Sequence, residues 1–369
     1  MGKSLRIAAI SLLLLMSIAG SLHAQTLLKP SWLKTLTDRH EGAVLAENGR
    51  CIVVTRKRVI EVLRPSGDAW WSWDFGAFNK YILPLNAAVS PGCDAIVVPG
   101  RSEYRYTWIV EQNGARRSVA TKIAPSDAAF DHSGQFIALG TSGQTLRLLT
   151  RTGKLVWQRD LDVAITSDLT FSDDDQFIVL QGWGGIGLVR IDGTPEWTQP
   201  SNRMRASRDL KTFVSSYEPN HGPGWSTIGV HDDTGRTLWF KDASVEAFVS
   251  GSGQRILARI DDNQEKTEQD GFADRQPGHP ELLTRDGQEL VRFLPGWRPL
   301  ALSDDGEISV LASPEAIKFV DARGNKLYEI QPGFSDYTSD FHVTRDFKHV
   351  MVTRRPYNGA GRLEWYDLP

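Results

Sequence analysis

Residues 127–157 read DAAFDHSGQFIALGTSGQTLRLLTRTGKLVW, and they contain one complete copy of a unit that recurs along the chain. Three short apolar runs, the last of which ends at Leu149, are separated by polar segments rich in glycine and serine. A turn centred on Gly153 then precedes a fourth run, which ends at Trp157. Short alternating runs with β-branched and aromatic residues between such turns are typical of strands. The stretch therefore predicts a four-stranded antiparallel unit.

The glycine turn at Gly153 has six counterparts elsewhere in the chain. Their central residues are Gly67, Gly114, Gly193, Gly235, Gly287 and Gly324. Most of the intervals are near forty residues, roughly the length of one four-stranded propeller blade. No long segment with helical periodicity lies between the turns, so the predicted fold class is all-β.

The two ends of the chain determine the predicted number of blades. After the seventh glycine turn, three more apolar runs follow at 340–343, 349–353 and 362–366, and the sequence ends before a fourth. Residues 31–36 resemble the closing strand at 156–161 and can supply the missing one. The prediction is an eight-bladed β-propeller of four-stranded antiparallel blades, with N- and C-terminal strands joined in one blade, which leaves no open edge in the ring.

The first 24 residues have the layout of a secretory signal peptide. Lys3 and Arg6 precede an uncharged apolar run at 7–19, and small residues follow up to Ala24. We expect cleavage after Ala24, which leaves residues 25–369 as a single propeller domain with no transmembrane segment, in the periplasm or secreted. An uncleaved anchor is the alternative, although the run is shorter than the roughly 20 residues that a membrane span needs.

The charge balance gives no sign of a nucleic-acid partner. The chain has 45 acidic residues against 42 lysines and arginines, and two of the basic residues lie in the expected signal peptide. Nucleic-acid-binding domains usually carry a basic patch or stripe. A protein or another component of the cell envelope is the more consistent partner.

The chain has two cysteines, Cys51 and Cys93, in adjacent repeats. A disulfide can persist in an oxidising compartment, and it requires that the repeats bring the two Cα atoms within about 7 Å. Two separate buried thiols are the alternative. Two cysteines are too few for a thiolate zinc site.

Two segments resemble a known family of repeats. Residues 151–158 (RTGKLVWQ) and 233–240 (DTGRTLWF) are similar to the T-G-K-x-x-W core of PQQ-like propeller repeats, and the Ser-Asp-Asp-Gly turn at 303–306 resembles WD40-like repeats. The PQQ-like superfamily includes quinoprotein dehydrogenases and a periplasmic propeller of the outer-membrane assembly machinery. The resemblance covers most of the chain, and it implies a fold rather than an activity.

The resemblance does not extend to the cofactor site of quinoprotein dehydrogenases. That family is usually longer and has a vicinal cysteine pair near its cofactor, whereas Cys51 and Cys93 lie in different repeats. We therefore expect no cofactor and a non-enzymatic member of the superfamily.

Two conspicuous residue types have structural interpretations. Trp157, Trp197 and Trp239 occupy equivalent places after the glycine turn, so we expect them to pack between neighbouring blades. The aspartates at 173–175 resemble a cation site, but their position repeats as an ordinary turn between strands. No metal is expected.

The segments that differ between repeats are the candidate binding loops. In a propeller, the loops between second and third strands share one face with the connections between blades. The candidate ligand- or partner-binding residues on these loops are Arg101, Tyr104, Arg105, Trp183, His221, Trp225, Arg354, Arg355 and Tyr357. Aromatic residues and arginine are enriched at interaction hot spots. A polar insertion at 261–280 on the same side indicates a further loop or flap.

The sequence favours an exported β-propeller scaffold that recognises a protein or cell-envelope ligand through its loop-rich face, without catalysis. The alternative is an extracytoplasmic enzyme that acts on a glycan or a related substrate with carboxylates at the channel mouth. A buried cluster of carboxyl groups with raised pKa at that mouth would indicate the enzyme.

Overall fold

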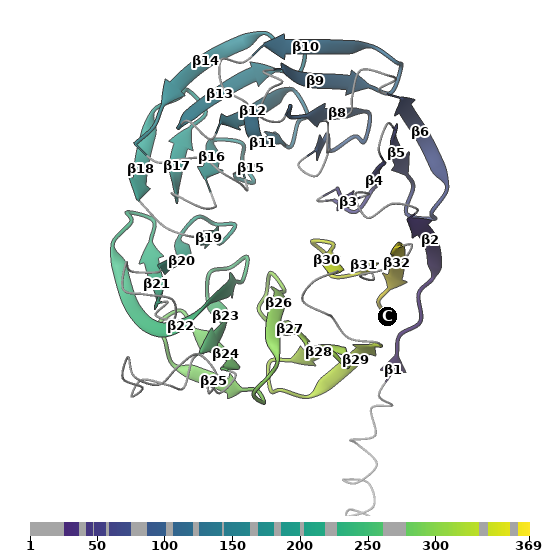
Figure 1. Ribbon diagram of the computed structural model, residues 1–369. Coiled ribbons are helices and arrows are strands. Elements are labelled where there is room, and N and C mark those ends of the chain that lie inside the picture. The colour runs from purple at the N-terminus through teal and green to yellow at the C-terminus, as the bar shows by residue number, and fades with distance from the viewer. Residues whose placement is uncertain are drawn as a thin grey trace, which may run out of the picture.

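The computed structural model shows a ring of β-sheets that follow one another in chain order (Figure 1). The residues that it describes are 26–36, 42–46, 48–56, 59–74, 87–100, 106–120, 125–141, 144–162, 169–180, 186–199, 203–217, 227–260, 278–331, 339–354 and 361–369. All regular elements in these ranges are strands. The predicted all-β fold is confirmed.

The first four blades are four-stranded antiparallel sheets. Blade 1 contains β3 (Gly42–Leu45), β4 (Ile52–Thr55), β5 (Val59–Leu63) and β6 (Ala69–Asp74). Blade 2 contains β7 (Ala88–Val89), β8 (Ala95–Val98), β9 (Tyr106–Glu111) and β10 (Arg116–Ala120). Blade 3 contains β11 (Pro125–Phe130), β12 (Phe136–Thr141), β13 (Thr145–Thr150) and β14 (Leu155–Asp160). Blade 4 contains β15 (Leu169–Phe171), β16 (Phe177–Leu180), β17 (Ile186–Arg190) and β18 (Pro195–Gln199).

Blades 5 and 6 share one long strand and form a continuous seven-stranded sheet. Blade 5 contains β19 (Arg203–Ala206), β20 (Thr212–Tyr217), β21 (Thr227–Asp232) and the first part of β22 (Thr237–Val249). Blade 6 continues with the last part of β22, then β23 (Arg255–Ile260), β24 (His279–Thr284) and β25 (Glu289–Arg292). Strand β22 is therefore both the outermost strand of one blade and the innermost strand of the next.

The last two blades include the N-terminal strands. Blade 7 contains β26 (Arg298–Leu302), β27 (Ile308–Ala312), β28 (Ile317–Asp321) and β29 (Lys326–Ile330). Blade 8 contains β30 (Ser339–Val343), β31 (His349–Arg354), β32 (Gly361–Asp367) and β2 (Trp32–Leu36). Antiparallel pairing of β2 with β32 closes the ring, as predicted. An additional strand, β1 (Thr26–Leu27), pairs in parallel with β29 and was not expected (Figure 1).

The hydrophobic core lies between the faces of neighbouring blades. In the interface of blades 3 and 4, for example, Ala138 and Leu148 belong to one cluster with Phe171 and Ile178. Similar clusters occur between other neighbours, so each blade depends on the next for the burial of its apolar face.

The seven glycine turns have the same conformation. Their φ angles are 86, 83, 81, 89, 80, 84 and 84° in chain order, in the left-handed region that glycine adopts without steric cost. Each glycine donates its N–H to the carbonyl oxygen three residues earlier, as Gly153 does to Thr150 at 2.8 Å. The turns join the third and fourth strands of blades 1 to 7, as the sequence predicts.

A tryptophan on the outermost strand of one blade contacts the glycine turn of the next. The Nε1–H of Trp157 donates to the carbonyl oxygen of Ile191 at 2.7 Å, and a Cβ added at Gly193 would lie 3.0 Å from the indole ring. The same contact joins Trp32 to the turn of Gly67 and Trp239 to the turn of Gly287. We call this contact the tryptophan latch.

Trp197 extends the pattern to blades 4 and 5. Its Nε1–H donates to the carbonyl oxygen of Asp233 at 3.1 Å, two residues before Gly235. The three tryptophans that repeat in the sequence therefore lie between blades, as expected, and Trp32 provides the equivalent contact between blades 8 and 1.

The latch predicts unequal effects of alanine at two glycines with the same backbone conformation. Both Gly193→Ala and Gly114→Ala place a side chain at positive φ, which costs about 1 kcal/mol. Only Gly193→Ala also meets an indole ring, because a Cβ at Gly114 has nothing within 4 Å. We expect a clearly lower urea midpoint for Gly193→Ala than for Gly114→Ala. Equal urea midpoints for the two variants would show that the contact between the indole ring and Gly193 does not stabilise the fold.

Blades 1 and 2 are joined differently. Trp71 lies opposite Val62 as Trp157 lies opposite Leu148, but it donates to the carbonyl oxygen of Cys93 at 2.8 Å and not to a glycine turn. A disulfide joins Cys93 to Cys51 across the same interface, with the two Cα atoms 6.2 Å apart. Both cysteines are fully buried. A disulfide therefore joins the two blades at the interface where the tryptophan does not contact a glycine turn.

The disulfide predicts a redox-dependent stability. The Cys51→Ser/Cys93→Ser variant should have a free energy of unfolding about 3 kcal/mol lower than that of the wild type. The reason is that the disulfide closes a long loop and so restricts the unfolded chain. Equilibrium urea unfolding with and without dithiothreitol measures this loss. The reductant should lower the midpoint of the wild type and leave the double variant unchanged; no shift in the wild type would show that the bond is not stabilising.

Candidate functional site

The turns between first and second strands, here called the inner turns, lie on the same face as the glycine turns. Backbone hydrogen bonds join the two kinds of turn within a blade, as between Arg151 N and Gln135 O at 2.6 Å. We call this face the turn face and the opposite one the loop face. The loop face carries the segments between second and third strands and the connections between blades.

All eight inner turns contain one residue with positive φ. These residues are Gly49, Cys93, Gly134, Asp175, Leu210, Gly253, Gly306 and Phe347. Each donates its N–H to the carbonyl oxygen three residues earlier. The repeated geometry shows that the inner turns are structural elements of the blade.

The serines and aspartates of the inner turns stabilise this geometry. Ser172 Oγ donates to Asp174 Oδ1 at 2.7 Å and accepts from the N–H of Phe177 at 2.9 Å. The hydrogen bond from Ser172 lowers the pKa of Asp174, so the carboxylate is ionised at neutral pH. The aspartates at 173–175 thus lie in a repeated turn, as expected. Among the residues that the structure describes, no cluster of three or more His, Cys, Asp or Glu could hold a metal ion.

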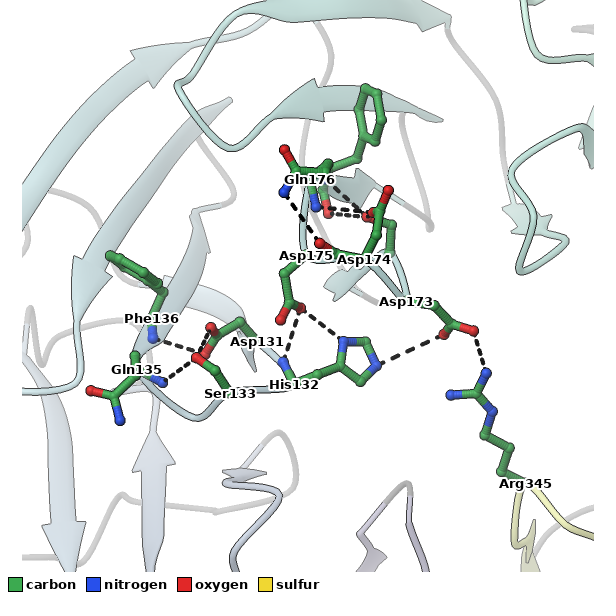
Figure 2. Close-up of polar contacts among 12 residues, drawn as sticks. Asp131, His132, Ser133, Gln135, Phe136, Asp173, Asp174, Asp175, Gln176 and Arg345 are labelled. Atoms are coloured by element: carbon green, nitrogen blue, oxygen red, sulfur yellow. Dashed lines mark hydrogen bonds and ion pairs between the residues drawn. The ribbon is translucent and has the colours of Figure 1, made fainter.

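The second residues of several inner turns meet at the axis of the ring and form a chain of charges. Figure 2 shows His132 and Asp173 next to each other, with Arg345 reaching Asp173 from the far side. Arg345 Nη2 bonds to Asp173 Oδ2, and His132 Nε2 lies 3.9 Å from Asp173 Oδ1. Nδ1 of the same histidine lies 2.8 Å from Asp175 Oδ1.

The chain of charges continues through two more blades. Asp304 Oδ2 lies 3.8 Å from Arg345 Nε and 2.9 Å from Arg208 Nη1. We call the six residues His132, Asp173, Asp175, Arg208, Asp304 and Arg345 the mouth network. Asp173 belongs to blade 4 and Arg345 to blade 8, which are opposite each other in an eight-membered ring. Their ion pair therefore spans the channel at the turn face.

The mouth network should contribute little to stability at high salt. Asp173 and Arg345 are 44% and 36% exposed, and exposed ion pairs contribute about 1 kcal/mol or less. Arg345→Gln should lower the urea midpoint slightly in dilute buffer and not at 1 M NaCl, where screening is nearly complete. Lys348→Gln, which removes a more exposed cation from the same turn, is the control. If Arg345→Gln lowered the urea midpoint equally in dilute buffer and at 1 M NaCl, the result would argue against an ion pair.

A cavity of about 870 Å³ lies at the centre of the ring. Its polar side chains come mainly from the innermost strands and inner turns of blades 5 to 8 and include Arg205, Glu246, Arg298 and His342. The guanidinium carbon of Arg205 lies 4.2 Å from the ring centroid of Phe248. Burial lowers the pKa of His342, so this imidazole is neutral at pH 7.

The described carboxyl groups with a resolved pKa shift do not show the environment expected of a catalytic acid. In the described part of the chain, every Asp or Glu with a resolved pKa shift has a lowered pKa. The largest shift is at Asp232, whose pKa falls to about 2 because it accepts a hydrogen bond from the Thr234 hydroxyl. A general acid at neutral pH needs a raised pKa. These groups are instead suited to accept hydrogen bonds.

Most of the candidate binding residues lie outside the described part of the chain. These are Arg101, Tyr104, Arg105, Trp183, His221, Trp225, Arg355 and Tyr357. The strand ends next to them, such as Val98 of β8 and Leu180 of β16, are at the loop-face ends of their blades.

Arg354 is the one candidate that the structure describes, and it is mostly buried. It ends β31 with 8% of its surface exposed, and its Nε donates to Glu364 Oε2 at 2.8 Å. Tyr366 Oη donates to the same carboxylate oxygen at 2.7 Å. These contacts place the Arg354 side chain within blade 8.

Sequence reasoning recognised the inner turns but not the mouth network. The available signal was that the second position of six of these turns holds a charged residue or histidine: Glu47, His132, Asp173, Arg208, Asp304 and Arg345. Repetition of charge at one blade position, next to the axis, can indicate contacts across a closed ring.

Comparison with solved structures places this architecture among known propellers. BamB from Moraxella catarrhalis is similar over 92% of this chain and 98% of its own, with a TM-score of 0.61 and 13% identity. The C-terminal WD40 domain of Sif2 is similar over 94% and 99%, with a TM-score of 0.62 and 14% identity. At these identities the similarity shows a shared fold. No family model and no curated protein matches the sequence.

A third similar structure shows that the fold alone does not define a function. Kuenenia stuttgartiensis hydrazine synthase has a TM-score of 0.51 and 12% identity, and the similarity covers 79% of this chain and 99% of that one. Proteins with very different names thus share this fold. The described residues include no helix with the length and apolar character needed to cross a membrane.

Proposed function

We propose that this chain is an exported scaffold that binds a protein or another cell-envelope component through its loop face, without catalysis. The observation that supports this proposal most directly is the difference between the two faces. The polar residues of the turn face repeat from blade to blade and are engaged in turn geometry, as Ser172 and Asp174 are. The sequence that does not repeat belongs to the loop face.

The composition of the non-repeating segments supports a binding role. Trp183, Trp225 and Tyr357 are combined there with arginines and glycines. Aromatic residues and arginine supply most of the binding energy in many protein interfaces, and glycine-rich loops on a rigid scaffold are frequent binding elements. The propeller supplies a rigid scaffold because its ring is closed.

Export is supported by the N-terminal sequence and by the disulfide. Residues 1–24 have the pattern of a signal peptide, and the bond between Cys51 and Cys93 is of the kind that persists in oxidising compartments. The similarity to BamB and to a WD40 domain is consistent with a scaffold, although at these identities it concerns the fold.

Site-specific photo-crosslinking tests the loop face. A photoreactive amino acid is placed at Trp183, Trp225 or Tyr357, and at Phe240 as a control. Phe240 is 65% exposed on the outermost strand of blade 5, where it pairs with Gly229 of β21, and it lies outside the candidate loops. We expect one common partner, identified by mass spectrometry in envelope extracts, to crosslink from the three loop positions and not from position 240.

The same partner should bind the Trp183→Ala/Trp225→Ala/Tyr357→Ala variant at least tenfold more weakly, as expected when hot-spot aromatic residues are removed. The Phe240→Ala variant should bind normally. A folded triple variant with unchanged binding, or crosslinks only from position 240, would contradict the proposal.

A further inference from the structure

Arg259 is a half-buried arginine on β23 that has no partner among the residues that the structure describes. Its Nε is enclosed by protein atoms and has no hydrogen-bond partner, and its guanidinium forms no ion pair within the same ranges. By contrast, the half-buried Arg255 on the same strand pairs with Glu307 at 2.7 Å. A buried donor without a partner costs about 1–3 kcal/mol, so its presence in a native fold needs an explanation. An anionic ligand would satisfy both the donor and the charge.

Arg259 faces blade 7 at the loop-face end of β23. Leu257, two residues earlier and therefore on the same face of the strand, belongs to the core cluster between blades 6 and 7. Arg259 lies opposite Pro280 of β24, and the carbonyl oxygen of Pro280 accepts the N–H of Phe293 at 2.9 Å. The connection from β25 to β26 therefore crosses this end of blade 6, next to blade 7 (Figure 1).

A second cation lies at the same end of this interface. Lys318 is on β28, two residues before Val320, which belongs to the core cluster between blades 6 and 7. Its Nζ lies 4.2 Å from the ring centroid of Trp297, the last residue before β26. An indole face attracts an ammonium group but has no conventional acceptor atom. This contact therefore holds Lys318 in place without using its N–H donors.

The carboxylates near Lys318 are bound to other groups. Hydrogen bonds from neighbouring residues lower the pKa of Glu315 and Glu329, and the charge of Lys318 is a smaller cause for both. Glu315 Oε2 accepts from Ser313 Oγ at 2.7 Å, and Glu329 Oε2 accepts from Lys326 Nζ at 2.7 Å. Within the described ranges, neither carboxylate forms an ion pair with Lys318.

Apolar surface borders the two cations. Leu294 lies in the same connection as Trp297 and is 72% exposed, more than any other large apolar side chain that the structure describes. Exposed apolar surface marks interaction sites, and tryptophan and arginine are enriched at binding hot spots. We call Arg259, Leu294, Trp297 and Lys318 the blade 6–7 cluster.

From this arrangement we infer that the blade 6–7 cluster binds an acidic segment of a protein partner. A carboxylate of that segment contacts Arg259 and Lys318, and an apolar side chain packs on Leu294. The planar donors of a guanidinium match the two oxygens of a carboxylate. Anionic membranes are usually recognised by about four to eight clustered cations, so two cations beside apolar side chains favour a peptide. The inference rests on the proposed function, because the cluster belongs to the loop face, and it adds the chemistry of the partner.

A peptide titration on the full mature chain tests the inference without knowledge of the partner. The fluorescein-labelled probe is the peptide Glu-Asp-Phe-Leu-Asp-Glu, and its amide counterpart is Gln-Asn-Phe-Leu-Asn-Gln. By fluorescence anisotropy, we expect submillimolar binding of the acidic probe and at least tenfold weaker binding of the amide probe. Equal binding of the two probes, or no binding of the acidic one, would overturn the inference. Binding of phosphatidylglycerol vesicles in place of the acidic probe would also overturn it and indicate a lipid surface.

Variants locate the acidic probe at the cluster. Arg259→Gln and Lys318→Gln should each weaken its binding at least fivefold, whereas the control Arg116→Gln should not, because Arg116 is exposed on β10. Arg259→Gln should also keep or raise the urea midpoint, since it removes a buried charge without a partner. A lower midpoint with unchanged affinity would show that Arg259 is structural and overturn the inference. If Arg259→Gln does not fold, unchanged affinity in Lys318→Gln would overturn it.

The peptide titration and the photo-crosslinking experiment can fail separately. The crosslinks from Trp183, Trp225 and Tyr357 test whether a partner binds the loop face, and the titration does not use these positions. Intact crosslinks without binding of the acidic probe would overturn only the blade 6–7 assignment. Binding of the probe that depends on Arg259, without crosslinks from the loops, would contradict the proposed loop positions and support the cluster.

Discussion

The tryptophan latch is the constraint on which the regularity of the ring depends. An indole ring on one blade needs a surface without a side chain on the next, and glycine provides it. The same glycine also adopts the positive φ of the turn, so a single residue type satisfies two requirements. Where the tryptophan is absent, as between blades 2 and 3, Val119 contacts Gly153 instead. Where it is displaced, at Trp71, a disulfide joins the blades.

Repetition made the fold predictable from one sequence. The glycine turns and the tryptophans recur at equivalent positions, and their spacing predicted the blades. The unmatched strands at the two ends of the chain then predicted the blade number and the mode of closure. Strand β1 carries no comparable signal, since it has only two residues. The mouth network was not predicted, because Asp173 and Arg345 are 172 residues apart and meet only when the ring is closed. The candidate loops rest on sequence alone, apart from Arg354.

The two faces and the central cavity have different chemical characters. On the turn face, serines and aspartates cap the turns, and their lowered pKa values reflect these hydrogen bonds. At the axis, side chains of opposite charge alternate across the ring. Deeper in the ring, the cavity wall carries four arginines and three acidic residues from the innermost strands and inner turns. The turn face therefore has a structural role, which is consistent with the proposal that recognition occurs at the loop face.

The pairing of β2 with β32 has a consequence for how the chain folds. The strand that completes blade 8 is made first, and its partner strand is made last. Contacts of such high sequence separation carry a large loop-closure entropy and form late. Blades 1 to 7 can assemble in order during synthesis, but the ring stays an open arc until the C-terminus is available. During that interval β2 has no partner strand and the apolar face of blade 1 that packs on blade 8 is uncovered, which makes this the period of greatest exposure to aggregation and the point at which a chaperone would have most effect.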